Sequence, residues 1–259
     1  MTELLTNRIA PERSPFRILC VHGAGCGAWV WRGILEWFEQ AGIPASALSL
    51  RGHGNSEGAD RLHEFRITDY VEDVIDAVGA SKPPPVLLGH SMGGLVVQKL
   101  LETRNFPGAV LLASTPVDGM LRDGLRMARR WPAQTLRSVL RRSLLELYDT
   151  DERARWFLFS DATDISLVRE VREKMGEESW RAILDMAFLA RPKPAMVKTP
   201  ILVLAGSQDN MVSRASNART AAAYNTETKF FDCCGHMMML ESVWPSVAEA
   251  IRDWCEELG

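Results

Sequence analysis

The chain has 259 residues, of which 46% are hydrophobic and 24% charged, enough to bury one large core in a single α/β domain. Its formal net charge of −3 excludes a bulk electrostatic attraction to nucleic acid or to an anionic membrane. Five cysteines make no disulfide framework, the acidic, polar start of the chain fits no secretory signal, and no apolar run approaches the roughly 20 residues of a membrane span, so we expect a cytoplasmic protein without stable membrane insertion.

Short strand-like runs alternate with helical patterns along most of the chain. The strands are expected near residues 16–21, 45–50, 85–89, 108–113, 200–205 and 228–231, and the helices near 30–41, 68–79, 92–104 and 243–257. This alternation is typical of strands joined by crossover helices, so it predicts a mostly parallel central sheet flanked by helices.

A glycine-rich loop, His22-Gly23-Ala24-Gly25, directly follows the first of these strands. A loop of this kind, after an early strand of an α/β sheet, can turn a backbone N–H toward a reacting oxygen. We therefore expect the Ala24 N–H to help bind an oxyanion. The simpler interpretation is a glycine turn that leads into the next helix.

The most informative stretch, Gly89-His90-Ser91-Met92-Gly93-Gly94, lies between an apolar run and a helical one. A serine in a sharp strand-to-helix turn needs very small residues two positions before and after it, because larger side chains would collide with the neighbouring strand and helix. Gly89 and Gly93 meet that need. The pattern predicts a nucleophile elbow, with Ser91 as the nucleophile and the N–H of Met92 as the second oxyanion donor.

The regular alternation stops between residues 117 and 196. This segment is rich in Arg, Leu, Met and Trp, has helical periodicity and contains no convincing strand. It predicts a helical cap, residues 117–196, inserted into a core formed by residues 1–116 and 197–259.

Large apolar side chains of the cap are expected mainly to pack its helices, as in any amphipathic helix, while some line an apolar slot. Met120 and Trp131 are the candidates for the slot. Arg122, Arg126 and Arg129 recur at helical spacing. They form either a solvated face or a patch for an anionic substrate.

Two aspartates follow strands in the second half of the chain. Asp209 comes after the apolar run 201–205, at the carboxyl edge of the sheet, where open parallel sheets carry their sites. It is the expected acid. Asp118, after the strand near 108–113, is the competing acid.

His236 follows the last strand and a short turn, and we expect it to be the base. Met237 comes next and, with the two methionines after it, either extends the apolar slot or fills the core. The other four histidines are expected to have mainly structural roles: His22, His53, His63 and His90.

Ser91, Asp209 and His236 occur in the chain order of a hydrolase triad. A serine hydroxyl is a poor nucleophile at neutral pH, so it needs an imidazole to take its proton and a carboxylate to orient that imidazole. No cofactor or metal is expected. Further substrate contacts are predicted at Gly23, His90, Met120, Trp131 and Met237.

The chain resembles α/β-hydrolases of the esterase and lysophospholipase kind over nearly its whole length. The resemblance is carried by His22-Gly23 with its loop, Arg51-Gly52-His53-Gly54-Asn55-Ser56, Gly89-His90-Ser91-Met92-Gly93-Gly94, Gly206-Ser207-Gln208-Asp209 and Gly235-His236. It implies an α/β-hydrolase fold with a helical cap and some freedom in where the acid lies, Asp209 or Asp118.

The first loop also resembles that of plant methylesterases and hydroxynitrile lyases. Where that group usually has histidine this chain has Cys26, where the lyases have threonine it has Gly23, and where they have lysine after the base it has Met237. These departures weigh against cyanohydrin cleavage, because no ammonium group follows the base to hold cyanide.

The sequence therefore predicts a serine hydrolase, carboxylesterase or lysophospholipase-like, that cleaves a small-molecule carboxylic ester with an apolar acyl group through an acyl-enzyme. Hydrolysis of another acyl bond or a carbon–carbon bond, acyl transfer, and ligand binding on the same fold stay open as alternatives. The oligomeric state is open as well.

Overall fold

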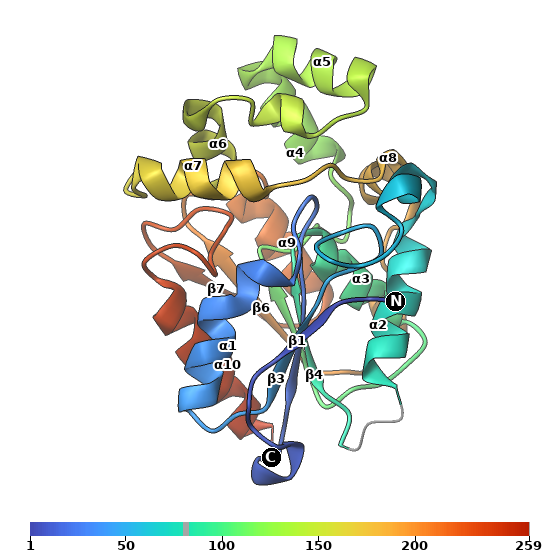
Figure 1. Cartoon of the computed structure of the whole chain (residues 1–259), viewed down its shortest axis with the longest axis vertical. Helices are drawn as coiled ribbons and strands as arrows, with labels where there is room; N and C mark the ends of the chain where they lie inside the picture. The colour runs from blue at the N-terminus through green and yellow to red at the C-terminus, as the bar shows by residue number, and fades with distance from the viewer. Residues whose placement is uncertain (80–82, 259) are drawn as a thin grey trace.

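A seven-stranded sheet forms the centre of the protein (Figure 1). The computed structural model describes residues 1–79 and 83–258. The strands, in the order in which they lie side by side, are β1 (Leu4–Thr6), β3 (Ala45–Leu48), β2 (Ile18–Val21), β4 (Val86–His90), β5 (Ala109–Leu112), β6 (Ile201–Gly206) and β7 (Thr228–Phe231). Only β1 is antiparallel to its neighbour, so the predicted mostly parallel sheet is confirmed.

Five helices pack on this sheet: α1 (Arg32–Gln40), α2 (Ile67–Val78), α3 (Met92–Leu101), α9 (Arg214–Ala223) and α10 (Trp244–Glu257). Four of them were expected from apolar periodicity. The exception is α9, whose buried side chains are polar or small, among them Asn217 and Ala221, so it shows almost no amphipathic pattern. Strand β1 was also missed, because three residues at a sheet edge are too short a pattern to recognise.

The sheet separates two hydrophobic layers. Along β2, Ile18 and Cys20 face the layer formed with α1 and α10, whereas Leu19 and Val21 face the layer formed with α2, α3 and α9. Figure 1 shows α1 and α10 on one side of the sheet and α2 with α3 on the other. This alternation explains why the strands are apolar throughout, since both of their faces are covered.

The chain between β5 and β6 is helical throughout its described secondary structure, and we call it the cap. Its helices are α4 (Leu121–Arg130), α5 (Pro132–Arg141), α6 (Asp151–Leu158), α7 (Ile165–Lys174) and α8 (Trp180–Leu184). The first four lie together beyond one end of the sheet (Figure 1). Throughout the described chain, every helix is too short or too polar to span a membrane.

Candidate active site

Ser91 lies on a sharp turn between β4 and α3. Its backbone has φ = 50° and ψ = −116°, outside the usual regions for a residue with a side chain. A Cβ atom at Gly89 would lie 2.6 Å from the carbonyl oxygen of Gly93, and one at Gly93 would lie 2.5 Å from that of His22. Both glycines are therefore required by close backbone contacts, and the turn presents the half-buried Ser91 side chain at the carboxyl edge of the sheet.

Asp209 and His236 form a buried hydrogen-bonded pair. The Nδ1 atom of His236 donates to Oδ2 of Asp209 at 2.9 Å. The other carboxylate oxygen of Asp209 accepts from the N–H groups of Met211 (2.7 Å) and Val212 (2.8 Å), so the carboxylate has a fixed orientation. Since Nδ1 is engaged, Nε2 is the ring nitrogen of His236 that remains for proton exchange.

Asp118, the competing acid, has different partners. Its Oδ2 atom accepts from Nε of Arg219 at 3.0 Å and lies 3.8 Å from Nε of Arg122. It is the Asp209 carboxylate that contacts His236. The geometry therefore favours Asp209 as the residue that orients the imidazole.

His90 contacts the backbone of His236. Its Nε2 atom donates to the backbone carbonyl of His236 at 3.1 Å, and the two rings lie 4.8 Å apart. Burial, together with the neighbouring imidazole, lowers the pKa of His90 well below its ordinary value. His90 is thus a neutral donor that helps to hold the backbone of the proposed base.

The two predicted oxyanion donors are also positioned at this edge. Met92 is the first residue of α3, where a backbone N–H has no acceptor within the helix. Ala24 follows β2 and lines the same cavity as Ser91. Within the described ranges, neither N–H has a hydrogen-bond acceptor in the protein. Neither N–H group is therefore already engaged by the protein, as an oxyanion donor requires.

A cavity of about 390 Å³ connects Ser91 and His236 with the cap. Of the five predicted substrate contacts, His90, Met120 and Met237 line it. Gly23 instead lies against the His90 ring, where a Cβ atom would come within 2.7 Å of Nδ1. Trp131 is outside the lining too: its indole packs edge-on against Trp156, with ring centroids 6.2 Å apart.

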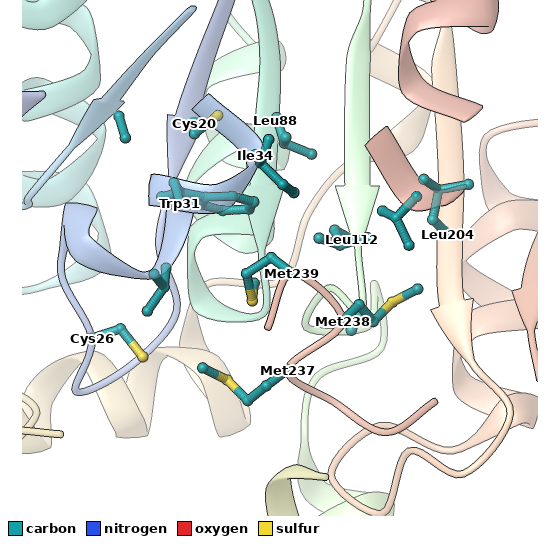
Figure 2. Packing of buried hydrophobic residues seen from close by; sticks show 14 of the residues in the cluster. Cys20, Cys26, Trp31, Ile34, Leu88, Leu112, Leu204, Met237, Met238 and Met239 are labelled. Atoms are coloured by element: carbon teal, nitrogen blue, oxygen red, sulfur yellow. The ribbon is translucent and has the colours of Figure 1, made fainter. Parts of the chain in front are cut away.

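The three consecutive methionines after His236 divide between cavity and core. Met237 lines the cavity and extends toward Cys26 (Figure 2). Met238 and Met239 are buried in the hydrophobic cluster that also contains Leu112 and Leu204 (Figure 2). The slot and the core filling that the sequence left as alternatives both occur, because Met237 belongs to the same buried cluster and also lines the cavity.

Cys26 is the one thiol on the cavity wall among the described residues. Burial, reinforced by the negative charge of Glu178, raises its pKa to about 12. The thiol therefore stays protonated at neutral pH and does not compete with Ser91 as a nucleophile.

Sequence reasoning missed one polar cluster beside the site. Glu178, in the cap, is fully buried and accepts hydrogen bonds from His53 and Tyr70. No local sequence pattern predicts the cluster around Glu178, because the partners of Glu178 are more than 100 residues away in the chain. Nowhere in residues 1–79 and 83–258 do three histidine, cysteine or acidic side chains gather as a metal site would require.

A mostly parallel sheet thus carries a serine on a strained strand-to-helix turn, and a buried Asp–His pair borders the same cavity; these are the residue types that serine hydrolases use. The chain belongs to the alpha/beta hydrolase family, whose model matches residues 18–250. The predicted family and fold are confirmed.

Esterases and lipases are among the relatives of the chain. The chain is 24% identical over 263 residues to a monoacylglycerol lipase of Mycolicibacterium smegmatis, covering 94% of this chain and 89% of that one. It is 27% identical over 250 residues to phospholipase YtpA of Bacillus subtilis, covering 93% and 95%. Polyneuridine aldehyde esterase of Rauvolfia serpentina is 40% identical over 87 residues, a match that spans only about a third of that relative's length (32%) and 32% of this chain.

Solved structures agree on the fold. A thermophilic esterase from Thermogutta terrifontis superimposes with a TM-score of 0.75 at 19% identity, covering 99% of this chain and 93% of that one. At this identity the likeness concerns the fold alone.

Proposed function

We propose that the protein is a serine esterase that cleaves carboxylic esters with an apolar acyl group, using Ser91, His236 and Asp209. At the coarser level it is an ester-hydrolysing enzyme of the alpha/beta hydrolase family, like relatives named esterase, monoacylglycerol lipase and phospholipase. One observation carries the finer proposal. Ser91, on its strained turn, opens into the same cavity as a histidine whose Nδ1 is held by a buried carboxylate.

In the proposed reaction, the Ser91 hydroxyl attacks the ester carbonyl while Nε2 of His236 takes its proton. Asp209 keeps Nδ1–H oriented and stabilises the imidazolium that forms. The N–H groups of Ala24 and Met92 bind the oxyanion. His236 then protonates the leaving alcohol, and a water molecule activated by His236 hydrolyses the acyl-enzyme.

The cavity supports an apolar acyl group. Its cap wall is made mainly of aliphatic and methionine side chains, among them Leu125, Met127 and Val139. Burying one methylene in such a slot contributes about 0.8 kcal/mol. The wall is therefore suited to an apolar acyl chain.

The cap arginines offer little support for a phosphate-bearing substrate. None of them lines the cavity within the described residues. Arg126 donates from Nη2 to the carbonyl oxygen of Asn210 at 2.8 Å and pairs with Asp123 at 3.4 Å. The carboxylesterase proposal is preferred over the lysophospholipase one on these contacts.

Hydrolysis of p-nitrophenyl esters tests the proposal. We expect turnover by the wild type, a loss of roughly 10⁴-fold or more in kcat for Ser91→Ala, and no change for Ser246→Ala, whose serine is exposed on α10. A Ser91→Ala variant that keeps a tenth of the activity would contradict the assignment. A folded wild type that hydrolyses no ester would contradict the esterase function and favour the ligand-binding alternative.

A further inference from the structure

Glu178 is a fully buried carboxylate between α7 and α8 that the proposed reaction does not use. Oε2 accepts from the N–H of Gly25 (3.1 Å) and from Nε2 of His53 (3.0 Å). Oε1 accepts from the hydroxyl of Tyr70 (2.8 Å) and the N–H of Ser179 (2.7 Å). Burying a carboxylate is costly unless it is fully paired, and here four donors satisfy it and fix its geometry.

The bond to Gly25 acts on the oxyanion loop, which we define as residues 23–26. Gly25 has φ = 65°, and the cap holds both of its backbone polar groups. Its N–H donates to Glu178, and its carbonyl oxygen accepts from the N–H of Gly176 at 2.8 Å. The contact with Glu178 fixes the peptide between Ala24 and Gly25, and the contact with Gly176 fixes the next peptide, between Gly25 and Cys26.

The peptide that precedes Ala24 is held from the core side. The carbonyl oxygen of Gly23 accepts from Nδ1 of His22 at 2.8 Å, and Nε2 of His22 accepts from the N–H of Leu50 at 3.0 Å. Burial lowers the pKa of His22 to about 3, which keeps it neutral in this role. Because N–H and C=O point in opposite directions in a trans peptide, the bound Gly23 carbonyl directs the Ala24 N–H away from His22.

His53 balances the negative charge of Glu178. A lone carboxylate beside the oxyanion loop would oppose the charge that develops on the substrate oxygen. Burial raises the pKa of Glu178, but the charge and hydrogen bond of His53, together with the hydrogen bonds from Tyr70 and Ser179, outweigh it and lower that pKa overall. Burial likewise lowers the pKa of His53, and Glu178 outweighs it and raises that pKa overall. The pair is ionised and carries no net charge toward the oxyanion.

We propose that Glu178 is a positioning residue for the oxyanion hole. By binding Gly25, Glu178 holds the oxyanion loop against the cap, so that the Ala24 N–H has its catalytic orientation before a substrate binds. The inference rests on the proposed esterase function, in which that N–H binds the oxyanion. It gives the cap a second role. Besides enclosing the acyl chain, the cap completes the catalytic geometry of the core.

The variant Glu178→Gln tests this, since it removes the charge and one acceptor with little change of shape. With p-nitrophenyl butyrate we expect kcat to fall about 10- to 100-fold, less than the roughly 10²–10³-fold loss for deleting an oxyanion donor, while KM stays within about twofold. Affinity for a butyl trifluoromethyl ketone, whose adduct with Ser91 carries an oxyanion, should fall by the same factor as kcat. Affinity for the matched methyl ketone should not change.

Glu177→Gln is the matched control. Glu177 is half-buried and accepts from the Ser143 hydroxyl at 2.6 Å, so this variant loses the same charge one residue away. It should leave kcat and KM unchanged. Should Glu178→Gln not fold, Glu178→Asp, which keeps the charge but withdraws the carboxylate from Gly25, should show the same split between kcat and KM.

Folded Glu178 variants with wild-type kcat and only a lower Tm would overturn the inference and leave Glu178 a structural residue. Failure of the esterase function has a different signature. The wild type itself would then neither turn over esters nor form the trifluoromethyl ketone adduct.

Discussion

Apolar side chains differ in exposure between the core and helix α5 of the cap. In the core, large residues such as Trp31 and Leu88 are fully buried between sheet and helices (Figure 2). On α5 of the cap, Leu136, Val139 and Leu140 are 59%, 54% and 73% exposed, and Val139 also lines the cavity. The core holds the proposed reacting groups in fixed positions, while α5 of the cap presents partly exposed apolar side chains, one of which lines the cavity. Changes in the core should therefore affect catalysis and stability, and changes at the rim should affect substrate choice.

The largest effect is expected for the acid. Without its carboxylate, His236 loses both its preferred tautomer and the stabilisation of its cation, so Asp209→Asn should lower kcat by about 10⁴-fold. Asp118→Asn, which disturbs only the contacts with Arg219 and Arg122, should stay within a few-fold of the wild type. Steady-state kinetics of both variants on one ester measure the two losses in kcat. A larger loss for Asp118→Asn than for Asp209→Asn would assign the acid to Asp118.

The next largest difference is expected in stability, where a leucine substitution in the core should cost more than one on the exposed face of the cap. Leu88→Ala leaves a cavity in the buried layer and should cost about 2–5 kcal/mol in the free energy of unfolding. Leu140→Ala, on the exposed face of α5, should change it by less than about 0.5 kcal/mol. Urea unfolding measures both. A large loss at Leu140 would show that this cap face is buried in solution.

Acyl preference should be set by the cap. We expect kcat/KM on p-nitrophenyl esters to rise nearly fourfold, or up to about 0.8 kcal/mol, per added methylene from acetate toward butyrate or hexanoate and then to fall. Val139→Phe adds bulk to the cavity wall and should move the optimum to shorter chains. Leu140→Phe, one residue along and outside the lining, should not. The same optimal acyl-chain length in both variants would show that the acyl chain does not bind against Val139.

The smallest effect is a pH dependence of stability. Glu178 has a lowered pKa in the folded state, so its contribution to stability is lost as pH falls through that pKa. His53 has a raised pKa in the folded state, so its contribution to stability is lost as pH rises through the folded-state pKa of His53. The neighbours of His53 are the neutral His22, Tyr70 and the carboxylate of Asp73. Wild-type Tm should pass through a maximum between the two pKa values.

Thermal unfolding from pH 3 to pH 10 measures this maximum, with a difference of a few degrees between wild type and Glu178→Gln. The difference should narrow at both ends of the range. A constant difference at every pH would show that the Glu178–His53 pair is not ionised.

Much of the fold and the proposed site could be predicted because the information is local. The elbow around Ser91 needs glycines at fixed positions, and Asp209 and His236 follow apolar runs that end at the same sheet edge. Trp131 could not be placed, since composition does not say which side of a cap helix faces the cavity. Glu178 could not be found either, because its bond to Gly25 joins residues 153 positions apart.

Labelling with a fluorophosphonate, followed by mass spectrometry of the modified peptide, tests the central proposal most directly. The account predicts one adduct on the wild type, at Ser91, formed more slowly in Asp209→Asn and absent in Ser91→Ala. An adduct on another residue, or one that persists in Ser91→Ala, would contradict Ser91 as the nucleophile.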